Sequence, residues 1–247
     1  MSNLEVNKID LEQIKLILHR RLTDSGWGTI LKTFILSNDM TKILEQLYSE
    51  SRSGQKFAPV ILQLLRAFEI CSYDKLKVIV VGQDPYSYGP DPKTKLPVAD
   101  GVAFSCSNKM YIPPSLKYMQ AEIRETIYGG VYDHSGDLTD WGLQGVLLIN
   151  SALTVTIGKI GTHYEMWKPF LTFLFDMLSK KEDLVYVFMG NVAQKWEGHV
   201  SSPNAAVLKC THPASAAHNN NEKWHSGDIF NKIGEELEKR NKTKIIW

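Results

Sequence analysis

Four short stretches of the chain are largely apolar and rich in Val, Ile and Leu, and they do not alternate with polar residues. They lie at residues 77–81, 145–151, 184–189 and 206–210. Unbroken apolar runs of this length are typical of strands that are covered on both faces of a parallel sheet. Parallel strands need long crossovers, and stretches long enough for helices separate these four. The pattern therefore predicts an α/β fold with a central four-stranded parallel twisted sheet and helices on both faces.

Helical periodicity predicts the elements outside the sheet. Apolar residues at helical spacing follow Asp10, a residue that suits an N-cap, and predict a helix that ends near Arg21. A proline-rich stretch leads to Ser115, which we expect to cap a helix that runs to Tyr128. Further helices are expected at 39–49, 59–70, 167–179, 192–195 and 228–239, followed by a frayed basic tail at 239–242. We expect one domain, 1–247, in which residues 1–50 form a helical extension packed on the rest.

Length and charge limit the kinds of partner. With 247 residues and 43% hydrophobic content, the chain can bury one large core. The 28 Lys and Arg residues nearly balance the 27 Asp and Glu residues, so no overall basic field marks a nucleic-acid partner. Backbone N–H groups and helix N-termini also hold phosphates, so a nucleic acid would have to be gripped locally.

The cysteine pattern indicates a reducing environment. Cys71, Cys106 and Cys210 are odd in number and show no C-x-x-C spacing, so we expect an intracellular protein, in the cytoplasm or, for a eukaryotic or viral source, the nucleus. Three cysteines are too few for a Cys₄ iron–sulfur site, and the histidines lack ligand spacing, so we expect neither a metal nor a cofactor. No long apolar span predicts contact with a membrane.

Polar residues follow each of the four predicted strands at its carboxyl end. They are Asp84, Asn150, Asn191 and His212. In open α/β sheets, ligands bind outside this edge of the sheet. We therefore expect these four side chains to meet in one site.

The residues after the first predicted strand carry a specific signature. Gly82-Gln83-Asp84-Pro85-Tyr86 resembles the first motif of the family-1 uracil-DNA glycosylases. Segments 101–105, 112–116, 141–155 and 211–218 also look like that family, so the resemblance runs from about residue 57 to about residue 230. It implies an enzyme that flips uracil out of DNA and hydrolyses its N-glycosidic bond, leaving an abasic site and free uracil.

The resemblance implies a division of labour between two catalytic residues. The reaction passes through a sugar with oxocarbenium character and expels the base as an anion, so it needs negative charge near the sugar and donors near the base. By resemblance, Asp84 positions the attacking water and stabilises the cationic sugar. His212 would donate a hydrogen bond to the uracil O2, as a neutral imidazole if its surroundings lower its pKa.

Four further residues are implied in binding uracil. An amide held in one orientation at Asn150 would accept uracil and reject cytosine, because their hydrogen-bonding edges are reversed. Tyr86 would be the wall that excludes the methyl group of thymine, and Gln83 would line the floor. Phe104 would stack on the flipped base.

DNA contacts are implied at Pro114, Ser115, Gly190, Asn191, Ser215 and Ala216. The resemblance also implies two partners, uracil-containing DNA in single- or double-stranded form and a proteinaceous inhibitor that mimics DNA. We expect the chain to act as a monomer.

The chain departs from the family at several positions. Ser87 stands where the family usually has His, and the loop at 88–100 is longer than usual. Ala216 stands where the family has a Leu wedge that enters the minor groove. If the wedge is missing, Ala216→Leu should raise activity on duplex DNA more than on single strands.

Other interpretations fit single residues or the whole chain. Taken alone, Asp84 could be a turn former, while Phe104 and His212 could be ordinary core residues. For the chain as a whole, the alternative is a catalytically weakened DNA-binding scaffold or replication accessory of the same fold. A nucleotide-cofactor protein is disfavoured because no strand is followed by G-x-G-x-x-G.

Overall fold

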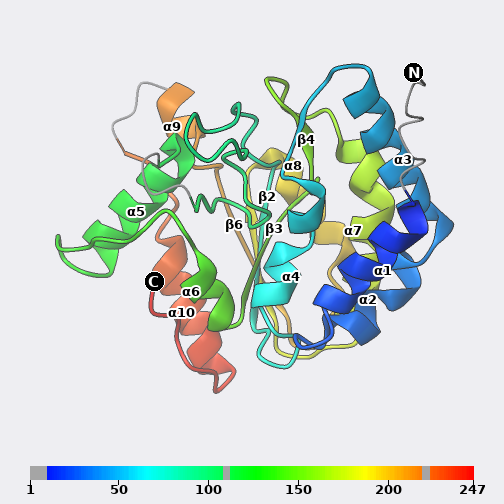
Figure 1. Ribbon diagram of the computed structural model, residues 1–247. Helices are drawn as coiled ribbons and strands as arrows, with labels where there is room; N and C mark the ends of the chain where they lie inside the picture. Colours follow the sequence, from blue (N-terminus) through cyan, green and yellow to red (C-terminus); the bar gives the residue numbers. More distant parts are fainter. Residues whose placement is uncertain (1–9, 108–111, 219–222) are drawn as a thin grey trace, which may run out of the picture.

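The computed structural model describes residues 10–107, 112–218 and 223–247, and it has a sheet between two layers of helices (Figure 1). The central sheet has the strand order β3-β2-β5-β6, and all three neighbouring pairs are parallel. Its strands are β2 (Val78–Gly82), β3 (Val146–Asn150), β5 (Val185–Met189) and β6 (Ala206–Cys210). Every residue of β2, β3 and β5 is buried, which explains why their sequences do not alternate. The predicted four-stranded parallel sheet is confirmed.

Helices cover both faces of this sheet. On one side lie α1 (Leu11–Arg21), α2 (Trp27–Ile35), α3 (Asn38–Arg52) and α7 (Tyr164–Leu178) (Figure 1). On the other lie α5 (Pro114–Thr126), α6 (Thr139–Leu143) and α10 (Ile229–Lys239) (Figure 1). Short elements complete the order: η1 (Ile61–Gln63), α4 (Arg66–Ile70), α8 (Asn191–Gln194), η2 (Glu197–His199) and α9 (Ser215–His218). None of the helices in the described parts of the chain is long and apolar enough to cross a bilayer.

The N-terminal helices belong to the same core as the sheet. Trp27 is fully buried, its ring meets that of Phe68 edge to face at 5.0 Å, and its indole N–H donates to the Cys71 carbonyl oxygen at 2.7 Å. The predicted cap of α1 is present, since the Asp10 carboxylate accepts from the Gln13 N–H at 3.1 Å. The prediction missed α2, which begins at Trp27 between the N-cap Gly26 and Gly28.

Several predicted helix boundaries are wrong, and α7, for example, begins at Tyr164 instead of Trp167. The helix expected at 59–70 is divided into η1 and α4, because Leu65 between them leaves the helical conformation (φ −111°, ψ 16°). Ser115 is not the N-cap of α5. Pro113 is the cap and Pro114 takes the first helical position, which proline favours because its missing N–H would have no partner there.

Two further segments differ from the prediction. A two-stranded antiparallel sheet of β1 (Phe57–Ala58) and β4 (Val155–Thr156) was too short to be recognised in the sequence. The basic tail is not frayed. The Arg240 guanidinium binds Glu236 and the Asn204 carbonyl oxygen, and Trp247 beyond it packs on buried aromatic rings, which holds the tail on the domain.

Candidate active site

A single cavity of about 260 Å³ lies at the carboxyl edge of the sheet, between the ends of β2 and β3 and the segment after β6. It brings Asp84, Asn150 and His212 together, although they are far apart in the sequence. Gln83, Tyr86 and Phe104 also line it, as do Ser87, Tyr88, Gly101, Val102, Ala103, Ser115, Leu153, Ile160 and Ala214. Parallel strands deliver their carboxyl ends to one edge, so the strand pattern alone explains this convergence.

Gly82 makes room for the side chain of Asn150. The two residues are paired in register at the ends of β2 and β3. A Cβ atom at Gly82 would lie 2.4 Å from the Asn150 Oδ1 and 3.0 Å from the Phe104 ring. Asn150 is only 7% exposed, and its side-chain amide has no hydrogen-bond partner in the described ranges. Its polar atoms are therefore available to a ligand in the cavity.

Asp84 is held by one of its two carboxylate oxygens. Oδ2 accepts from the Gly161 backbone N–H at 2.6 Å, which ties the β2 turn to the loop before α7. Burial raises the pKa of Asp84, and the hydrogen bond from Gly161 opposes that rise. The second oxygen remains available to a water or a cationic sugar.

His212 is a neutral imidazole with a defined tautomer. Burial lowers its pKa to about 4, so the ring is uncharged at neutral pH. Nδ1 accepts from the Ala214 backbone N–H at 3.2 Å, which leaves the ring proton on Nε2. Gly190 gives the ring its place, because a Cβ there would lie 2.8 Å from the His212 Cβ. The site thus has a neutral N–H donor.

Phe104 forms an aromatic wall next to this imidazole. Its ring centroid lies 5.6 Å from that of His212. Its backbone is in the left-handed region (φ 65°), which costs a non-glycine residue about 1–3 kcal/mol and needs support from its surroundings. The Tyr86 hydroxyl supplies part of it by donating to the Phe104 carbonyl oxygen at 2.8 Å.

These features bring an amide, a neutral N–H donor, a carboxylate and an aromatic ring to one cavity. Among the described residues, no group of His, Cys, Asp or Glu could hold a metal ion. The model for the uracil DNA glycosylase superfamily matches residues 68–238, which is more than half of the chain. The chain belongs to the uracil-DNA glycosylase superfamily.

Individual relatives agree with this assignment. Uracil-DNA glycosylase 2 of Bacteroides fragilis is 33% identical over 226 residues, which cover 91% of this chain and 98% of the relative. The crystal structure of mimivirus uracil-DNA glycosylase has a TM-score of 0.82 at 26% identity and covers 96% of this chain and 90% of that one. A mimivirus UNG variant in complex with UGI gives the same TM-score and identity, covering 96% and 92%. Membership makes the chain a DNA repair glycosylase that excises uracil, as the sequence predicted.

The predicted uracil-binding residues all line the cavity, whereas only some of the predicted DNA contacts do. Ser115 is buried and lines the cavity, and Pro114 precedes it at the start of α5. The Gly190 N–H donates to the Cys210 carbonyl oxygen at 2.9 Å, and the predicted DNA contact at Gly190 stays a prediction. Asn191, which follows it, is exposed and does not line the cavity, so the expectation that the four side chains after the strands meet in one site is wrong for Asn191.

The expected role of Ala216 at the DNA surface is also wrong. It is only 3% exposed and packs in the hydrophobic core, because α9 turns this residue inward. Ser215, beside it, is half-buried, and its N–H donates to the His212 carbonyl oxygen at 2.9 Å. This hydrogen bond fixes the turn that carries the imidazole.

Sequence reasoning missed two contributors to the site. Gly161 acts through its backbone N–H, which no side-chain pattern reveals. The Tyr164 hydroxyl is buried close to Gln83 and Asp84, and burial raises its pKa to about 12. His163, between them, is structural: its ring binds Thr154, Thr156 and Glu50.

Proposed function

We propose that the cavity binds a flipped deoxyuridine with the base between Phe104, Asn150 and His212, and with the sugar toward Asp84. The observation that carries this proposal is that one cavity holds a half-buried carboxylate and a neutral imidazole with its proton on Nε2. Glycosidic cleavage needs these two groups on opposite sides of the breaking bond.

Asp84 serves the sugar and the attacking water. As the bond to the base lengthens, positive charge builds on the sugar, and the carboxylate stabilises it through space. With Oδ2 held by Gly161, the other oxygen orients a water toward the anomeric carbon. The water oxygen forms the new C–O bond and its proton passes to the Asp84 carboxylate and from there to solvent. The C–N bond electrons stay with the departing uracil, and the uracil anion takes up a proton after release.

His212 serves the leaving base. Negative charge on uracil collects partly on O2, and a neutral Nε2–H stabilises it by hydrogen bonding. A cationic ring would cost desolvation free energy in this half-buried position, and the low pKa avoids that cost. The Ala214 N–H keeps the proton on the correct nitrogen throughout.

Base selection follows from Asn150 and Tyr86. The Asn150 amide can donate to O4 and accept from N3–H of uracil, whereas cytosine would face it with the opposite pattern. A buried mismatch of this kind discriminates strongly. Tyr86, anchored on the Phe104 carbonyl oxygen, is rigid enough to exclude a methyl group at C5.

The expected partners and compartment are part of the proposal. We infer that single- and double-stranded uracil-DNA are both substrates. We also infer that the chain acts as a monomer, since the three side chains that the proposed reaction needs, Asp84, Asn150 and His212, already meet in one cavity of a single chain. An inhibitor such as UGI, seen bound to the mimivirus relative, would bind here too. The three cysteines are unpaired and buried, which supports a reducing intracellular compartment, cytoplasm or nucleus.

One assay separates the enzyme from a DNA-binding scaffold of the same fold. The protein is incubated with a uracil-containing oligonucleotide in the presence of a chelator, and free uracil and alkali-labile sites are measured. We expect both products, with a thymine-containing oligonucleotide left intact. A protein that binds the oligonucleotide but releases no uracil would be the scaffold instead.

A further inference from the structure

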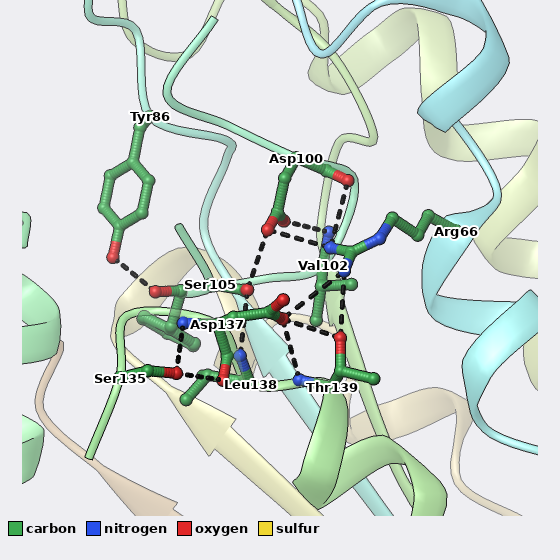
Figure 2. Close-up of polar contacts among 10 residues, drawn as sticks. Arg66, Tyr86, Asp100, Val102, Ser105, Ser135, Asp137, Leu138 and Thr139 are labelled. Atoms are coloured by element: carbon green, nitrogen blue, oxygen red, sulfur yellow. Dashed lines mark hydrogen bonds and ion pairs between the residues drawn. The ribbon is translucent and has the colours of Figure 1, made fainter. Parts of the chain in front are cut away.

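A buried network of charged and polar groups lies behind the cavity wall, outside the catalytic constellation (Figure 2). Its centre is an ion pair between Arg66, at the start of α4, and Asp100, in which Nη1 and Oδ2 are 2.8 Å apart. The Asp100 side chain is 3% exposed and that of Arg66 is 19% exposed. Burial raises the pKa of Asp100, and the charge of Arg66 opposes that rise.

Asp100 holds residues 101–105, called the wall segment below, of which residues 101–104 line the cavity. Its Oδ1 accepts from the Val102 N–H at 3.1 Å, and its Oδ2 accepts from the Ser105 hydroxyl at 2.9 Å. The Ser105 oxygen in turn accepts from the Leu138 N–H at 3.1 Å. One carboxylate therefore closes the turn on both sides of Phe104, whose backbone is in the left-handed region.

Arg66 anchors this turn to a second segment. Its Nη2 donates to the Thr139 hydroxyl at 2.9 Å and lies 3.4 Å from the Asp137 carboxylate. Asp137 also accepts from the Thr139 N–H at 3.0 Å. Figure 2 shows the guanidinium between the two carboxylates, so that α4, the wall segment and the start of α6 are joined at one point.

The network touches the base-binding surface without facing the cavity. Residues 101–104 line the cavity, whereas Arg66, Asp100 and Ser105 do not. The wall segment also fixes Tyr86, since the Tyr86 hydroxyl donates to the Phe104 carbonyl oxygen. A shift of this segment would move both the stacking ring and the residue proposed to exclude C5 substituents.

We propose that Arg66 and Asp100 are positioning residues that determine base specificity: their ion pair holds Phe104 and Tyr86 where uracil fits and a base with a C5 substituent does not. This inference rests on the proposed roles of those two aromatic residues. Burying an ion pair costs desolvation free energy. The hydrogen bonds of the guanidinium and the carboxylate offset this cost only when the two groups and their partners are in one geometry. Such a pair therefore fixes one arrangement of the wall.

The chain contains a matched control for this pair. Arg21 binds Glu69, on the same short helix α4, through two bonds of 2.7 Å each. Neither residue lines the cavity. Breaking this second ion pair also perturbs α4, but it leaves the wall segment intact.

The experiment compares Arg66→Gln with Arg21→Gln on single-stranded oligonucleotides that carry uracil or 5-bromouracil, whose halogen is about methyl-sized. The readout is the ratio of the two kcat/KM values, which does not depend on the fraction of protein that is folded. We expect Arg66→Gln to lower the preference for uracil by about tenfold, the discrimination of a methyl-sized group in a pocket, and Arg21→Gln to leave it unchanged. Arg66→Lys should restore part of the preference.

A second variant keeps the test informative if Arg66→Gln does not fold. Ser105→Ala removes one of the two hydrogen bonds to the wall and should lower the same ratio by a smaller factor. An unchanged ratio in every folded variant of Arg66 and Ser105 would overturn the positioning role. Failure of the unmodified protein to release uracil would instead overturn the proposed function, so the two failures are distinguishable.

Discussion

At the residue scale, small side chains and backbone groups determine where the reactive side chains lie. Gly82 leaves the space that the Asn150 amide fills, and Gly190 leaves the space for His212. The Gly161 N–H fixes one oxygen of Asp84, and the Ala214 N–H fixes the tautomer of His212. Main-chain N–H groups and the space left by glycines therefore orient the reactive side chains. Their positions depend little on the conformations of other side chains.

Gly82→Ala should damage recognition of the base without unfolding the chain. The new Cβ would meet the Asn150 Oδ1 at 2.4 Å, so the amide or the Phe104 ring must shift. Misplacement by about 1 Å can cost about 100-fold in rate, and we expect a loss of kcat/KM of that order. Gly198→Ala is the control, because a Cβ at Gly198 meets nothing within 4 Å. Equal activity of the two variants would show that recognition of the substrate does not depend on the position of the Asn150 amide.

The protonation state of His212 gives a prediction for the effect of pH. Its pKa is lowered to about 4, so it should remain neutral, and competent as an Nε2–H donor, from about pH 5 to about pH 8. Because the pKa of His212 is lower in the folded chain than in the unfolded chain, the neutral ring stabilises the fold. This stabilisation is fully present above the unfolded pKa and is lost as the pH falls from the unfolded pKa toward the folded one. NMR of the ring nitrogens checks the state directly. A titration of His212 near its ordinary pKa would contradict the assignment.

At the element scale, the sequence predicted the strands and their polar ends well, because both are local signals. Unbroken Val and Ile runs indicate buried parallel strands, and Asp84, Asn150 and His212 follow them directly. The cap of α1 was predicted correctly, but the cap of α5 and the burial of Ala216 in α9 were not. Whether Ser115 caps α5, or which way α9 turns Ala216, depends on tertiary packing that a local pattern does not contain.

Ala216→Leu tests the corrected position of α9. The sequence alone suggested that this change would restore a wedge and favour duplex DNA. Since Ala216 is buried in the core, the larger side chain should instead overpack it and lower the free energy of unfolding by about 1–3 kcal/mol. Denaturant unfolding measures this loss. Unchanged stability together with a gain on duplex DNA would return Ala216 to the DNA surface.

At the scale of the whole molecule, the N-terminal helices and the sheet share one hydrophobic core. Trp27 of α2 packs on Phe68 of α4, which leads into β2, and Glu50 of α3 reaches His163 beside the Asp84 loop. We therefore expect residues 10–247 to unfold as one cooperative unit, even though the family model matches only residues 68–238.

Trp27→Ala tests this cooperativity. Removing a fully buried Trp should lower the free energy of unfolding by about 3–5 kcal/mol and shift the whole transition. Calorimetry and circular dichroism should report a single transition in both proteins. Separate transitions, with the sheet unaffected by the change, would mean that the N-terminal helices form an independent unit.

The most direct test of the whole account is single-turnover excision by Asp84→Asn, with DNA affinity measured on the same preparation. The amide oxygen can still accept from Gly161, so the cavity should stay intact while the negative charge is removed. We predict near-normal binding of uracil-DNA and a loss of excision of about 100-fold or more. Excision at the rate of the unmodified protein would contradict the central claim that this carboxylate stabilises the cationic sugar.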